Sequence, residues 1–251
     1  MDDWLQRPTP LLRWRSGLLK LESLRPGGGV DDRALGIFPQ VARGDEASLA
    51  ATAGGALAAA GWARRRGVRL AIALHGATSH EMRAALRVWG ARFEQLPSRE
   101  AALRRARELP GTALPPLDGP KAALEFARTL GAELREELAE PPARLVAPAG
   151  ATAALLGTLQ ALRSRWPAVR GVALVAAEDE LPELPVAADM PGLELRPVSF
   201  AEAARARAEL ARTSGILASH AAAAAALAAG EGGLALITSA GEREFSLERA
   251  A

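Results

Sequence analysis

Several residue types are missing from this chain of 251 residues, and each absence excludes certain bonds or kinds of site. There is no cysteine, which excludes disulfides, thiolate metal ligands and a cysteine nucleophile. Tyrosine and asparagine are absent as well, and Lys20 and Lys121 are the only lysines. Because almost all of the positive charge is on arginine, the sequence fits a GC-rich genome, and its few thermolabile side chains are compatible with a thermophilic source.

Long apolar runs are also missing. No stretch reaches the roughly 18 residues of a membrane-spanning helix, and Met1-Asp2-Asp3-Trp4 lacks the basic and apolar regions of a signal peptide. We therefore expect no membrane partner and a cytoplasmic location. The net charge is only +2, and the arginines alternate with acidic residues along helical segments. That pattern is typical of solvated helix faces, so we expect no nucleic-acid partner either.

Segments with the pattern of strands alternate with segments that have the pattern of helices. This order predicts an α/β fold with parallel strands and right-handed crossovers. The expected strands are 18–22, 47–49, 69–74, 92–96, 144–147, 171–176, 193–198 and 233–237. The expected helices are 33–41, which is short, 55–66, 79–89, 99–108, 121–138, 153–165, 199–214, with a capping box, and 221–229. The Pro- and Gly-rich segment 109–120 indicates a boundary, and 178–191 an acidic loop.

The stretch Leu18–Arg33 joins a short apolar strand to a glycine turn and a charged helix start. With the lead-in Arg7-Pro8-Thr9-Pro10-Leu11, it resembles the opening of the fold type II pyridoxal-phosphate enzymes, which include threonine synthase, cysteine synthase and the tryptophan synthase β chain. The resemblance implies a lysine after the turn that holds the cofactor as a Schiff base. Asp31 stands at that position, and a carboxylate cannot supply the amine.

Further segments resemble the same family in the same order. The resemblance implies that Thr52, Ala53 and Gly54 lie in the loop that receives the substrate carboxylate, and that Ser239 is the partner of the cofactor's pyridine nitrogen. It places the glycine-rich phosphate cup at Gly150, Ala151, Thr152 and Ala153. The segments 86–91 and 118–121 are similar to two other stretches of the family.

The chemistry of these segments is weaker than in the family. A phosphate cup needs several backbone N–H groups aimed at one point, and of its glycines only Gly150 remains, so an ordinary strand-to-helix turn is the alternative. The end of the following helix can still receive a non-covalent anion. The missing asparagine removes the side chain that contacts the cofactor ring in the family. Asp31 and Asp32 are also explained simply as acidic residues at a helix N-terminus.

Other candidate groups have plain explanations too. We expect Lys20, at a strand end, and Lys121, at a helix start, to be exposed rather than to replace the missing lysine. The spacing of His75, His80 and His220 matches no metal site, although His75 follows a strand at the sheet edge where α/β proteins bind ligands. A triad of Ser219 or Ser239 with His220 and Asp31 has no nucleophile-elbow motif to support it.

The sequence therefore predicts a two-lobed α/β protein, with a larger lobe from 1–43 and 117–251 and a smaller inserted lobe at 44–116. The expected function is that of a catalytically degenerate homologue of pyridoxal-phosphate-dependent lyases and synthases acting on amino acids. It would serve as a binding or partner subunit, in a homodimer or in a heteromer with an intact relative. Two alternatives stay open: an active threonine synthase-like or cysteine synthase-like enzyme with unusual site residues, and an unrelated small-molecule-binding α/β protein.

Overall fold

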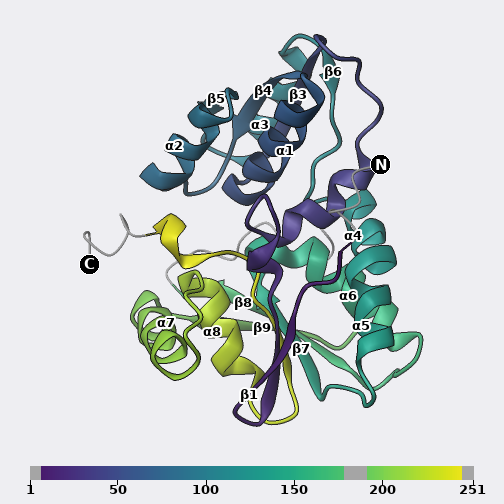
Figure 1. Ribbon diagram of the computed structural model, residues 1–251, viewed down its shortest axis with the longest axis vertical. Helices are drawn as coiled ribbons and strands as arrows, with labels where there is room; N and C mark the ends of the chain where they lie inside the picture. Colours follow the sequence, from purple (N-terminus) through teal and green to yellow (C-terminus); the bar gives the residue numbers. More distant parts are fainter. Residues whose placement is uncertain (1–6, 178–190, 245–251) are drawn as a thin grey trace.

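Two lobes, each built on its own sheet, make up the computed structural model, which describes residues 7–177 and 191–244 (Figure 1). The larger sheet has the strand order β1-β2-β10-β7-β8-β9, and the smaller has the order β5-β4-β3-β6. Every strand pairing is parallel except that of β1 with β2. The α/β fold class and the two-lobed architecture predicted from the sequence are confirmed.

The larger lobe is a sheet covered by helices on both faces. Its strands are β1 (Leu11–Trp14), β2 (Gly17–Lys20), β7 (Arg144–Pro148), β8 (Arg170–Ala176), β9 (Leu193–Val198) and β10 (Leu234–Leu236). Its helices are α4 (Pro120–Phe126), α5 (Ala132–Glu137), α6 (Thr152–Arg163), α7 (Phe200–Ser214) and α8 (His220–Ala229). Alternate residues of β7 face opposite layers: Leu145 packs in the core with α4 and α6, and Val146 packs in the core with α7 and α8.

The smaller lobe repeats the strand–helix alternation. Its strands are β3 (Glu46–Ala51), β4 (Arg69–Leu74), β5 (Arg92–Gln95) and β6 (Thr112–Ala113), all from within the predicted segment 44–116. Its helices are α1 (Ala53–Arg66) and α2 (His80–Val88), which pack on each other, and α3 (Arg99–Glu108), which packs on β3 and β4. The strand β6 was not predicted, because its two residues are recognisable only through their pairing with β3.

Several boundaries differ from the sequence-based prediction. The expected helix 121–138 is α4 and α5 joined by a π-helical segment, Ala127–Gly131, whose Gly131 packs against Ala161 of α6. The strand predicted at 193–198 is confirmed as β9, which lies at one edge of the larger sheet, and the capping box of Ser199 and Glu202 at the start of α7 is also confirmed. The predicted acidic loop lies outside the described residues, apart from its last residue.

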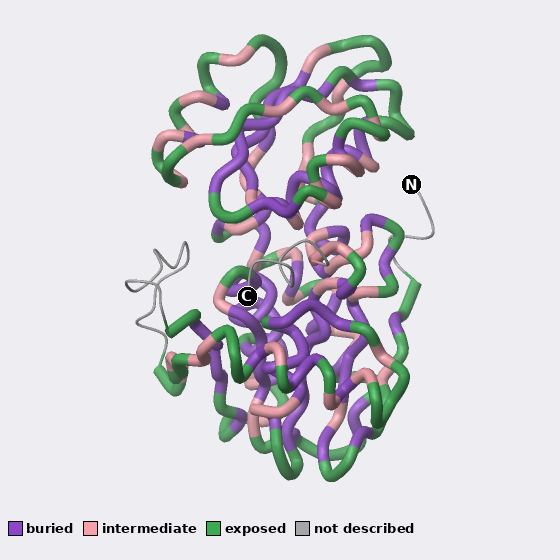
Figure 2. The backbone as a smooth tube through the Cα atoms, turned by 90° about the vertical axis from the view of Figure 1, so that its left-hand side faces the viewer, coloured by how far each residue is buried: buried purple, intermediate pink, exposed green. Residues whose placement is uncertain are grey.

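A 3₁₀ helix, Val30–Ile37, lies where the lobes meet, and we call it the junction helix. It contacts α1 of the smaller lobe and α4 of the larger lobe, and Leu35 shares one buried cluster with Leu57 and Phe126. Buried backbone therefore runs through both lobes and the region between them (Figure 2). Among residues 7–177 and 191–244, no helix is long and apolar enough to cross a membrane.

Candidate ligand site between the lobes

Lys20, at the end of β2, is completely buried, so the expectation of an exposed lysine is wrong. Its Nζ donates to the carbonyl oxygen of Thr9 at 2.8 Å and forms ion pairs with Glu133 and with Glu137, the latter at 2.5 Å. The burial arises because β2 lies between β1 and β10 while α5 brings its two carboxylates over the strand end. The amine is therefore fully engaged in holding α5 to the sheet.

A second buried ion pair ties the start of the chain to the junction helix. Arg33 donates from Nε and Nη2 to the two carboxylate oxygens of Glu22, at 2.8 and 2.7 Å, and from Nη1 to Glu133 at 2.5 Å. Burial lowers the pKa of Arg33, but the bonds to Glu22 outweigh it and the net pKa is raised. Thr9 completes the network by donating its hydroxyl to Glu22 at 2.5 Å. These residues of the opening motif therefore have a structural role: they hold the start of the chain, the junction helix and α5 together.

Asp32 closes the glycine turn. The backbone N–H of Gly27 donates to Asp32 Oδ2 at 2.5 Å, and a side chain at Gly27 would overlap the carboxyl group. Burial raises the pKa of Asp32 to about 6, although the Gly27 N–H and the Arg25 guanidinium oppose that rise. The turn is therefore shaped by a carboxyl group packed on a residue without a side chain.

Asp31 is directed toward the smaller lobe. Its Oδ2 is only 2.5 Å from the place where Gly54 would carry a Cβ atom, so the carboxyl group packs on the N-terminal turn of α1. Burial raises the pKa of Asp31 to about 7, with the negative charges of Asp32 and Asp118 adding to the rise and Arg243 opposing it. The structure thus brings together two predicted site positions, Asp31 and the loop Thr52–Gly54.

Arg243 is a junction residue that was not singled out from the sequence, although it lies four residues after Ser239. Its guanidinium donates to the carbonyl oxygen of Gly27 and covers Gly28, where a Cβ atom would overlap it and where φ is +73°. The Ser79 hydroxyl at the start of α2 donates to the Arg243 carbonyl oxygen at 2.5 Å. Burial lowers the pKa of Arg243. The segment after β10 therefore links the glycine turn to the smaller lobe.

Three more polar residues lie near the junction helix, on the smaller lobe and on the segment that leads from it to α4. Asp118, just before α4, accepts hydrogen bonds from Arg99 Nε and Nη2 at 2.9 and 3.2 Å. His75 directly follows β4, as predicted, and its Nε2 lies 3.9 Å from Asp118 Oδ2. A buried histidine and a half-buried ion pair of Arg99 and Asp118 thus lie at the carboxyl end of the smaller sheet, close enough for the charge of Asp118 to act on Asp31.

The predicted phosphate cup is a short 3₁₀ turn, Ala149–Ala151, that leads into α6. Thr152 donates its hydroxyl to Ala149 within this turn, and Ala151, Thr152 and Ala153 are buried. A Cβ atom at Gly150 would meet nothing within 4 Å, so packing does not require glycine there. This geometry fits either alternative, so the ordinary strand-to-helix turn and the non-covalent anion at the end of α6 both stay predictions.

Ser239 lies beside the glycine turn through a backbone bridge to Gly29, and its hydroxyl donates to Ser219 Oγ at 2.8 Å. His220 does not serve either serine: Nδ1 is 2.8 Å from Glu244, and Nε2 is 3.5 Å from Arg207 Nη1. The triad drawn with Asp31 is therefore wrong. Within the described ranges, no group of three or more acidic or histidine residues is placed to hold a metal ion.

Comparisons with known proteins place this geometry in a wider context. The family model described as "Pyridoxal-phosphate dependent enzyme" matches residues 5–242. Among solved structures, the O-acetylserine-dependent cystathionine β-synthase from Helicobacter pylori has a TM-score of 0.81 at 22% identity, over 98% of this chain and 97% of that one. O-ureido-L-serine synthase has a TM-score of 0.80 at 24% identity, over 98% and 94%.

A hydrogen sulfide-producing enzyme from Fusobacterium nucleatum has a TM-score of 0.81 at 16% identity, over 97% of this chain and 99% of that one. At these identities the likeness to solved structures shows a shared fold. A search of curated proteins found no significant match.

Proposed function

Because the chain belongs to the family of pyridoxal-phosphate-dependent enzymes, we propose that it is a catalytically degenerate member that acts by binding a ligand or a partner. The proposal rests on the identity and position of Asp31. It stands at the position where the family resemblance expects the Schiff-base lysine, and its carboxyl group packs on the N-terminal turn of α1 at the junction. A carboxyl group cannot form a Schiff base.

Neither lysine of the chain replaces the missing amine. Lys20 Nζ is buried and bonded to Thr9, Glu133 and Glu137. Lys121 is exposed in the first turn of α4, as predicted for a helix start. An active enzyme with unusual residues would require a free amine at the junction, and the positions of Lys20 and Lys121 do not favour this alternative.

The remaining cofactor positions fit covalently bound pyridoxal phosphate poorly as well. Ser239 gives its hydroxyl hydrogen to Ser219, and Thr152 gives its own to Ala149. The family's ring-contacting asparagine has no counterpart, because the chain contains no asparagine. We therefore assign no step of a reaction to this site. The proposed role is binding, or pairing in a homodimer or with an intact relative, in the cytoplasm.

Reconstitution with pyridoxal phosphate tests the proposal. The purified chain should be incubated with the cofactor, scanned for the visible absorbance band of a lysine-bound cofactor, reduced with borohydride and mapped by peptide mass spectrometry. We expect no band and no modified lysine beyond the level of a denatured control. A stoichiometric adduct on Lys20 or Lys121 would overturn the proposal.

The variant Asp31→Lys asks whether the rest of the pocket persists. The matched control is Asp45→Lys, which adds the same side chain at an exposed site on the smaller lobe. If D31K gains a borohydride-stable adduct at residue 31 and D45K does not, Asp31 is the change that removed the covalent chemistry. If D31K stays folded and unlabelled, the cup and ring contacts are lost too, and the degenerate assignment is strengthened.

A further inference from the structure

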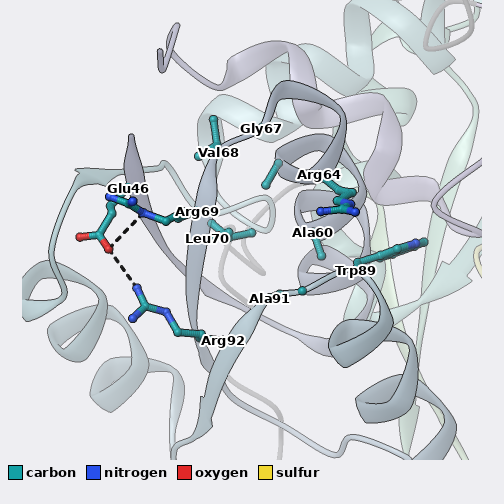
Figure 3. A pocket seen from close by; sticks show the side chains of 12 residues that line it. Glu46, Ala60, Arg64, Gly67, Val68, Arg69, Leu70, Trp89, Ala91 and Arg92 are labelled. Atoms are coloured by element: carbon teal, nitrogen blue, oxygen red, sulfur yellow. Dashed lines mark hydrogen bonds and ion pairs between the residues drawn. The ribbon is translucent and has the colours of Figure 1, made fainter. Parts of the chain in front are cut away.

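A cavity of about 660 Å³ lies on the smaller lobe at the end opposite the junction (Figure 3). It is formed by the C-terminal ends of α1 and α2 and by the N-terminal ends of β4 and β5. Gly54, in the first turn of α1, lies beside Asp31, whereas the residues of α1 that line the cavity begin at Ala60, about 9 Å further along the helix. The cavity is therefore distinct from the site described above.

The apolar part of the cavity is a floor of buried residues and an aromatic wall. The floor is formed by Ala60, Ala63, Val68 and Leu70. The wall is the indole of Trp89, whose Cη2 and Cζ3 lie 3.8 and 3.9 Å from where a Cβ atom of Gly61 would be, so the ring packs closely against α1. This combination offers a flat apolar surface to the body of an organic ligand.

The charged part of the cavity is positive. Arg64, Arg69 and Arg92 line it together with a single carboxylate, that of Glu46. Glu46 Oε1 lies 3.2 Å from Arg92 Nη2 and 3.5 Å from Arg69 Nε, so these two arginines share one negative charge. The three guanidinium groups and one carboxylate leave an excess of positive charge, which favours an anionic ligand.

Arg64 is the group best placed to receive that anion. Within the described part of the chain, no hydrogen bond or ion pair engages its guanidinium, whereas the neighbouring Arg66 lies over the ring of Trp62 at 5.5 Å. Figure 3 shows Arg64 on the Trp89 side of the cavity, while Arg69 and Arg92 reach toward Glu46. A guanidinium beside an indole can pair with an anion while the ring holds the apolar body.

We propose that this cavity binds an anionic ligand with a flat ring system, of the class of nucleoside monophosphates. The ring would pack on Trp89 and the apolar floor, and the phosphate would pair with Arg64. A volume of about 660 Å³ is within the range of small-molecule sites. The planar fork of arginine matches phosphate oxygens.

Isothermal titration calorimetry on the full chain tests the proposal with three probes: AMP, adenosine and inorganic phosphate. We expect AMP to bind more tightly than either of the other two, because only AMP has both the ring and the charge. The variant Arg64→Gln should weaken AMP binding by at least about tenfold while leaving adenosine binding unchanged. The variant Trp89→Leu should weaken AMP binding without changing that of phosphate.

The matched control is Arg128→Gln, which removes an exposed arginine from the larger lobe. We expect it to bind AMP as the wild type does, and circular dichroism should show that all variants are folded. The proposal is overturned if AMP does not saturate the chain, if phosphate alone binds as tightly as AMP, or if R64Q and R128Q weaken AMP binding equally. Because the cavity is distant from Asp31, failure here leaves the proposed function untouched.

Discussion

Replacing Asp31 with asparagine should remove a pH dependence from the stability of the fold. Asp31 has a pKa of about 7 in the folded chain against 3.8 as an ordinary value, with burial as the main cause. Between these pH values the folded chain keeps the proton and the unfolded chain releases it, so the free energy of unfolding falls as pH rises through this window. At about 1.4 kcal/mol per pKa unit, the free energy of unfolding would fall by at most about 4 kcal/mol across the whole window, and partial exposure of the residue reduces this to about 2–3 kcal/mol.

The assay is urea denaturation of the wild type and of Asp31→Asn at about pH 5 and about pH 8. Only about two of the three pKa units lie between these pH values, so the variant should gain stability over the wild type by about 1–2 kcal/mol more at the higher pH than at the lower. Asp45→Asn, at an exposed carboxylate, is the control and should show no such difference. If the stability difference between D31N and wild type is the same at both pH values, the carboxyl group is not buried as described.

Four further substitutions test packing. Lys20→Met should lower the free energy of unfolding by about 3–5 kcal/mol, because Glu133 and Glu137 lose a buried partner; a loss below about 1 kcal/mol in urea would contradict this. Gly157→Ala should lower the free energy of unfolding by about 1–3 kcal/mol in urea, because its Cβ atom would overlap the Ala123 carbonyl oxygen between α6 and α4. Gly150→Ala, measured in the same way, should be nearly neutral because its Cβ atom would meet nothing within 4 Å. Gly54→Ala should destabilise the wild type more than it destabilises an Asp31→Gly background, and a double-mutant cycle without such coupling would show that the two residues do not touch.

Local patterns were enough to predict most elements of the fold. The bounds of β4 and α3 agree with the sequence, because β4 is a short apolar run and α3 is a charged helix with a serine cap. The prediction was incomplete where no local pattern marks the structure. The hairpin of β1 and β2 turns at Arg15, a non-glycine residue with φ of +53°, which no turn motif indicates.

The candidate site could be predicted only in part, for a similar reason. The ordered resemblance predicted that Asp31 and the loop at Gly54 belong to one site, and the structure brings them together. The burial of Lys20 depends on carboxylates more than a hundred residues later in the chain, so its strand position gave no indication of it. Arg243 was overlooked because an arginine in an Arg-rich chain is not distinctive until its contact with the glycine turn is seen.

The opening motif separates into residues that hold the fold and one that faces the junction. Lys20 and Arg33 bond to α5, Glu22 bonds to Arg33 and Thr9, and Asp32 bonds to its own turn. None of these contacts involves the Asp31 side chain, so a change at position 31 leaves the scaffold network intact. The residue at position 31 can therefore change while the architecture is kept. For the same reason D31K should fold, and its failure to retain pyridoxal phosphate would report on the remaining pocket rather than on collapse of the turn.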